Sequence, residues 1–129
     1  MNKEVSKIKQ SYRPAWVVQE NSIDNEAVDW ANEVGKYLAN EGLSTSSLRR
    51  FFGELRRIQT DFERFKSDIP MLRAKLAYDA KRKGQAVEDF YEITNGIIIN
   101  IDKDHARFNR FVKIVEAIVA FHKFAGGKE

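Results

Sequence analysis

The chain has 129 residues, of which 43% are hydrophobic and 32% charged, a composition typical of one soluble globular domain. It contains no cysteine, which excludes disulfides, zinc–thiolate sites and thiol nucleophiles. The formal net charge is +3, but residues 44–83 carry 11 Lys or Arg against 5 Asp or Glu, and the rest carries 11 against 14. A basic middle on a mildly acidic frame predicts a surface for an anion, most often nucleic acid. A solvated charged surface without a ligand is the alternative.

Residues 1–22 show no sustained hydrophobic period, and Pro14 interrupts any helix there. We expect a flexible N-terminal arm, although Trp16 and its two valine neighbours could order against a partner. Residues 23–129 are expected to form a single domain. No apolar run approaches the ~20 residues of a membrane span, and the N-terminus lacks a signal-peptide core. The expected location is therefore the cytoplasm, with no membrane partner.

A first helix is predicted to begin at Ser22 or Asp24, either of which can cap it, and to end at Gly42. Its apolar face comprises Ala27, Trp30, Val34, Tyr37 and Leu38.

The strongest pattern covers residues 44–68, where apolar side chains alternate steps of three and four without a gap. This spacing predicts one long amphipathic helix, capped by Ser44 or Thr45. We expect it to stop near Asp68, because Pro70 pushes Ile69 out of helical geometry and suits the first turn of the next helix. The apolar positions are Leu48, Phe51, Leu55, Ile58, Phe62, Phe65 and Ile69.

Three more helices are predicted after Pro70. One runs to Gly84, and one spans residues 86–101, where helical spacing outweighs the turn signal Asn95-Gly96 and the β-branched IIINI. The last runs from Asp104 to about Ala125. The predicted fold is all-α: a compact bundle of about five helices with the flexible arm.

No catalytic motif stands out, so the chain is not expected to be an enzyme or to hold a cofactor. His105 follows Asp102 and Asp104, but this run lacks the glycine and distal glutamate of a calcium loop, and we interpret it as a helix cap. His122 lies on the apolar face of the last helix and is interpreted as a partly buried histidine. No metal site is predicted.

Arginines flank the apolar stripe of the long helix in two columns. Arg50, Arg57 and Arg64 alternate with Glu54 and Asp61, which are neutralising helix pairs.

Arg49 and Arg56 have no acid three or four residues away, and Gly53 lies between them. Two guanidinium groups without an acidic partner, on either side of a residue that has no side chain, are a candidate site for a phosphate backbone.

Residues 42–50, GLSTSSLRR, also fit the turn and recognition-helix start of a helix-turn-helix DNA-binding protein. Against this, the motif usually has an alanine four residues before the glycine of its turn, and Ala39 is one residue away from that position. The following helix is also longer than a typical recognition helix. A structural adaptor whose basic face binds an acidic protein is a further alternative.

Three blocks in the right order together resemble the small subunit of type III-A CRISPR effector complexes. They are LRRFFGELRRI (48–58), LRAKLAYDAKR (72–82) and FNRFVKIVEAIVAFHKFAGGK (108–128). The resemblance implies a non-catalytic helical bundle in antiviral defence. It implies that several copies stack beside the backbone and large subunits and contact the CRISPR RNA–target RNA duplex through phosphates.

Within the matching blocks, the basic positions implied to bind RNA lie on two segments, and those without a helical acid partner, Arg49 and Arg56, are the strongest candidates. Exposed aromatics such as Phe124 or Trp16 are candidates for self-association. The candidate RNA-binding residues are Arg49, Arg50, Arg56, Arg57, Lys75 and Arg82.

Overall fold

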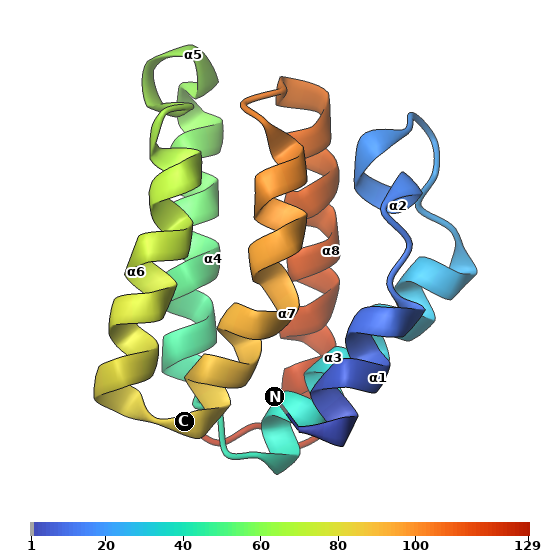
Figure 1. The fold of residues 1–129 in the computed structure, drawn as a ribbon, viewed down its shortest axis with the longest axis vertical. Coiled ribbons are helices and arrows are strands. Elements are labelled where there is room, and N and C mark those ends of the chain that lie inside the picture. Colours follow the sequence, from blue (N-terminus) through green and yellow to red (C-terminus); the bar gives the residue numbers. More distant parts are fainter. Residues whose placement is uncertain (1) are drawn as a thin grey trace.

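The computed structural model describes residues 2–129, and all of their regular secondary structure is helical (Figure 1). The predicted all-α class is confirmed, but these residues form eight helices rather than about five. The helices are α1 (Lys3–Ser11), α2 (Ala15–Val18), α3 (Asn25–Asn40), α4 (Thr45–Thr60), α5 (Phe62–Phe65), α6 (Asp68–Lys83), α7 (Gln85–Ile101) and α8 (His105–Phe124).

Helix α3 packs mainly on α8, and α6 packs mainly on α7. Figure 1 shows α4 and α6 side by side at one edge of the molecule, joined by the short α5, with α1 and α2 at the opposite edge. Helices α7 and α8 lie between the two edges. No helix formed by residues 2–129 combines the length and the apolarity needed to cross a membrane.

The N-terminal segment is not a flexible arm, and that prediction is wrong. The Asn2 side chain caps α1 by accepting from the Val5 amide at 2.8 Å, and Val5 and Ile8 are buried. Pro14 does not end helical structure but precedes α2, whose Trp16 and Val17 are also buried. These few apolar residues are too short a run to show a period, yet they join the common core. The division of the chain at residue 22 stays a prediction.

The predicted helix over residues 44–68 is broken at Asp61, whose φ of −155° and ψ of 80° are not helical. Its carboxylate caps α5 instead, accepting from the Arg64 amide at 3.4 Å. The apolar stripe continues across the break because Phe62 and Ile69 are still buried in the same core. Ile69 is helical, contrary to the prediction, because Pro70 lies in the first turn of α6, where its missing N–H costs no hydrogen bond.

The prediction of a helix over residues 86–101 is confirmed by α7, in which Ile93, Ile97 and Ile101 are buried. Asn95-Gly96 does not interrupt it. The helix ends where Asp102 and Lys103 take positive φ values of 47° and 58°.

The predicted caps of three helices are also present, since Asp24, Ser44 and Asp104 accept from the amides of Ala27, Ser47 and Arg107 at 2.9, 3.1 and 2.9 Å.

Candidate nucleic-acid interface

Helix α4 has one buried apolar side and one exposed basic side. Its apolar residues Leu48, Leu55 and Ile58 are buried against the rest of the bundle, as their spacing predicts. Arg49 and Arg56 are exposed, and Gly53 between them is exposed as well. A Cβ atom added at Gly53 would have no neighbour within 4 Å, so the helix backbone is bare there.

The side chains of Arg49 and Arg56 form no hydrogen bond or ion pair with any residue of the described chain, 2–129. The Arg56 guanidinium carbon lies 5.8 Å from the centroid of the Phe52 ring, an arrangement that leaves its N–H donors available. Arg49 has one acidic neighbour that helical spacing does not reveal. The pKa of Glu129 is lowered mainly by Lys123, whose Nζ lies 2.8 Å from its carboxylate, and Arg49 adds to this lowering.

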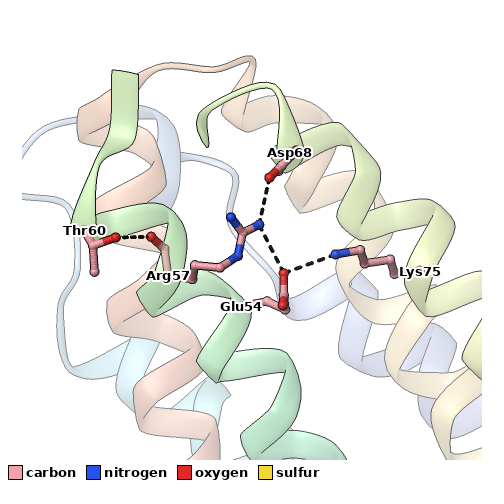
Figure 2. A network of polar contacts seen from close by, with 5 residues as sticks. All are labelled: Glu54, Arg57, Thr60, Asp68 and Lys75. Atoms are coloured by element: carbon pink, nitrogen blue, oxygen red, sulfur yellow. Dashed lines mark hydrogen bonds and ion pairs between the residues drawn. The ribbon is translucent and has the colours of Figure 1, made fainter. Parts of the chain in front are cut away.

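Arg57, by contrast, is half-buried and paired with two carboxylates of the same chain (Figure 2). Its Nη2 donates to Asp68 at 2.7 Å and to Glu54 at 3.3 Å, and its guanidinium lies 4.6 Å from the centroid of the Phe65 ring. The hydrogen bond to Asp68 is the main reason that the pKa of Arg57 is raised, with Glu54 adding to it. The sequence pattern revealed the Glu54 pair, but not Asp68, which lies on the next long helix.

Lys75 of α6 is also paired, because its Nζ donates to Glu54 at 3.2 Å (Figure 2). Partial burial, the largest single influence, raises the pKa of Glu54, but Lys75 and Arg57 together outweigh it and lower the pKa. A chain of charges thus connects α4 to α6, and two of the six candidate residues have partners within the molecule.

Arg50 and Lys75 both lie at a hollow between α4 and α6, with a volume of about 160 Å³. Its floor is apolar and includes Leu48, Phe51 and Leu72. The hollow therefore brings Arg50 of α4 and Lys75 of α6 to one place, whereas Arg49, Arg56 and Arg82 do not line it.

Arg82, the last candidate, is exposed in the final turns of α6, where its guanidinium carbon lies 5.5 Å from the centroid of the Tyr78 ring. Sequence reasoning did not select Tyr78, although it lies four residues before Arg82 and three after Lys75. This spacing on one helix face was the available signal.

The two histidines have structural surroundings. His105 stacks on Phe62 with ring centroids 4.1 Å apart, directly after the capping Asp104. His122 is buried, and its Nε2 lies 2.7 Å from the Leu43 carbonyl oxygen, to which it donates. In the part of the chain that the structure describes, no three His, Asp or Glu side chains are grouped so that they could hold a metal ion.

The two aromatic candidates for self-association differ. Trp16 is buried beneath Tyr12 and Trp30, so its selection as an exposed residue was wrong. Phe124, at the end of α8, is 88% exposed.

Comparison with known proteins assigns the chain to a family. The sequence model of the family Csm2 Type III-A matches residues 21–128. The chain is 32% identical over 101 residues to a Streptococcus thermophilus protein described as "CRISPR system Cms protein Csm2", an alignment that covers 74% of this chain and 79% of that protein. No solved structure matches it. The chain therefore belongs to the Csm2 family of type III-A CRISPR systems, whose small subunit the three sequence blocks resemble.

Proposed function

We propose that this small subunit binds RNA phosphates through the exposed side of α4 and has no catalytic role. The observation that carries the proposal is the pair Arg49 and Arg56, both exposed and without an ion pair among residues 2–129. Seven residues of helix place their Cα atoms about 10 Å apart along the axis, so the two side chains can bind different phosphates. The bare backbone at Gly53 allows the strand to approach closely between them.

The proposed binding does not depend on sequence. Arginine forks pair with phosphate oxygens in two parallel hydrogen bonds, and base pairing between the CRISPR RNA and the target RNA supplies specificity. A single subunit with two to four such pairings binds weakly and loses affinity steeply with salt. Several copies stacked along one duplex convert weak binding into strong binding through effective concentration.

The six candidate residues contribute unequally in this proposal. Arg49, Arg50, Arg56 and Arg82 have no ion pair within residues 2–129 and bind phosphates directly. Arg57 and Lys75 would have to leave Glu54 to do so, and therefore add mainly positive potential.

The proposed partners are the CRISPR RNA and the target RNA, the backbone and large subunits of the effector complex, and further copies of the same chain. Phe124 supports self-association, because an exposed phenylalanine at a helix end gains by burial against a neighbour. The proposed location is the cytoplasm, where transcripts are found.

The test is a double charge reversal, Arg49→Glu with Arg56→Glu, in the assembled complex. We expect retention of a matched guide–target RNA duplex on filters to fall more than tenfold. We also expect the slope of log K against log salt to be reduced by about two for each copy of the chain on the duplex, because each of the two arginines neutralises one phosphate. The matched control is Lys7→Glu with Lys9→Glu, which reverses two exposed charges at the opposite edge of the molecule.

Unchanged retention and an unchanged salt slope in the α4 variant would show the proposal to be wrong. If the complex retains RNA without salt dependence and the α4 variant instead loses a protein subunit, the basic surface binds an acidic protein. Preferential binding of duplex DNA with one sequence would favour a helix-turn-helix protein.

A further inference from the structure

The outer side of α6 carries large side chains that the core does not use. Leu72 and Leu76 face the core and are buried, whereas Tyr78 is 65% and Met71 is 52% exposed. Lys75, Tyr78 and Arg82 follow one another at steps of three and four, so they form one stripe along the exposed side. Most of the Tyr78 ring is therefore outside the core and accessible to a ligand.

The exposed charges of α6 nearest Tyr78 are positive, although one of them, Lys75, is paired with Glu54 of α4. Lys75, Lys81 and Arg82 are exposed on this part of α6. The two acids of the helix lie elsewhere, since Asp68 is paired with Arg57 and Asp79 lines the hollow towards α4. The guanidinium carbon of Arg82 lies 5.5 Å from the centroid of the Tyr78 ring, in the range of a cation–π interaction. The ring is thus held against a cation, and most of its surface remains free.

We propose that Tyr78, supported by Arg82, is a stacking platform for an unpaired RNA base. This inference rests on the proposed function and adds binding of a base where α4 binds phosphates. Unpaired bases stack on tyrosine rings and on guanidinium planes, and neighbouring cations pair with the flanking phosphates. A base inside an A-form duplex presents no free flat surface, so the platform takes single-stranded target RNA beside the duplex.

The platform is continuous with the proposed phosphate-binding surface. Lys75 lies in the same stripe as Tyr78 and lines the same hollow as Arg50 of α4. A strand that leaves the duplex held by α4 can therefore follow positive side chains across the hollow to α6. Glu54 also lines the hollow and is paired with Lys75 at 3.2 Å, so Lys75 has to exchange this ion pair for a phosphate where the strand crosses.

A protein partner is the competing occupant, because Tyr, Met and Arg are all common in protein interfaces. Two lysines in the same patch count against it, since lysine is depleted at interface cores, and the absence of an exposed acid on the stripe favours a polyanion. The charge on α6 therefore favours RNA.

The test uses the full-length chain and three probes of equal length: a 12-nucleotide single-stranded oligouridine, an RNA duplex, and a ribose-phosphate strand without bases. Tyr78→Ala is expected to lower affinity for the oligouridine about five- to a hundredfold, as the loss of one stacked base does. It should leave affinity for the duplex and for the abasic strand unchanged. Because Tyr78 is exposed, the unfolding midpoint of the variant should match wild type.

Two further variants separate stacking from apolar packing. Tyr78→Phe keeps a ring and is expected to retain affinity for the oligouridine, whereas Tyr78→Leu keeps apolar bulk without a ring and should lose it. If Tyr78→Leu binds oligouridine like wild type, the ring does not act by stacking and the platform does not exist. If Tyr78→Ala leaves oligouridine affinity unchanged while weakening co-purification of other subunits, the stripe binds protein instead.

The inference and the proposed function fail in distinguishable ways. If Tyr78→Ala has no effect on the oligouridine while the double reversal of Arg49 and Arg56 abolishes duplex binding, only the platform is wrong. If the wild-type chain binds none of the three probes and the assembled complex shows no salt-dependent retention, both are wrong.

Discussion

Gly35 and Gly53 lie inside helices, but their surroundings are opposite. A Cβ atom at Gly35 would lie 2.7 Å from the His122 nitrogen and 2.9 Å from the Ile118 carbonyl oxygen, both backbone atoms of α8. Gly35 therefore allows α3 and α8 to approach closely. Gly53 has no such neighbour, so its presence costs helix stability without any gain in packing.

Gly53→Ala is expected to stabilise the chain by about 0.5–1 kcal/mol, because alanine loses less backbone entropy in a helix. The measurement is the urea midpoint with the slope held constant. Gly35→Ala is the control, since it changes the unfolded chain in the same way but should destabilise by about 1–3 kcal/mol through overpacking.

A destabilised Gly53→Ala variant would mean that the backbone there is not as open as the structure shows. If the variant is more stable but retains less RNA, the loss supports close approach of the strand at this position.

At the scale of elements, α4 and α6 are connected by charges beside a hollow rather than by close packing alone. Glu54 of α4 lies between Lys75 of α6 and Arg57, and Arg57 also pairs with Asp68 at the start of α6 (Figure 2). All four side chains are partly exposed, so solvent screens each pair and its contribution to stability is small. The network connects α4 and α6 in one orientation and adds only modestly to the stability of the fold.

The lowered pKa of Glu54 predicts how this connection depends on pH. Because the pKa is lower in the folded than in the unfolded state, its contribution is complete above the unfolded value and is lost as pH falls through the folded value. Glu54→Gln is expected to lower the free energy of unfolding by up to about 1 kcal/mol at pH 7. As the pH falls below about 5, the variant should lose less stability than wild type. Urea unfolding at several pH values measures both effects.

Glu88→Gln is the control, because Glu88 is exposed on α7 and has no ion pair within residues 2–129. If Glu54→Gln and wild type lose stability with the same profile as pH falls, the network does not contribute to folding stability.

At the scale of the whole molecule, the N-terminal helices and the bundle share one core. Ile8 and Val17 are buried with residues of α3, α7 and α8. Trp30 of α3 donates its indole N–H to the Ile8 carbonyl oxygen at 2.9 Å, and Arg110 of α8 donates to the Val17 carbonyl oxygen at 2.6 Å. The N-terminal segment is therefore fastened at two points as well as packed.

Ile8→Ala is expected to destabilise the whole chain by about 2–5 kcal/mol, the usual cost of a cavity at a buried isoleucine. Tryptophan fluorescence and far-UV circular dichroism should give the same urea midpoint, as in one cooperative transition. The control is Lys7→Ala at an exposed position of α1. An Ile8→Ala variant with wild-type stability would indicate that the segment does not fold with the bundle.

The sequence by itself determined the features that depend on neighbours three or four residues apart. The all-α class, the buried side of α4 and the helical state of residues 86–101 are local, and all are present. The sequence also narrowed each of three helix caps to two residues, of which the structure uses Asp24, Ser44 and Asp104. Local acid pairing also identified Arg57 as compensated by Glu54. The three sequence blocks led to the family because their order is a property of the chain alone.

Only the tertiary structure decided the features that join residues far apart in the chain. The N-terminal segment is ordered because its few apolar side chains find a core built by residues more than 20 positions away. Arg57 meets Asp68, and Lys75 meets Glu54, only because the turn at Asp61 folds α6 back along α4. Which basic side chains remain free for an anion is therefore a tertiary property, because ion pairs between helices depend on packing and not on helical spacing.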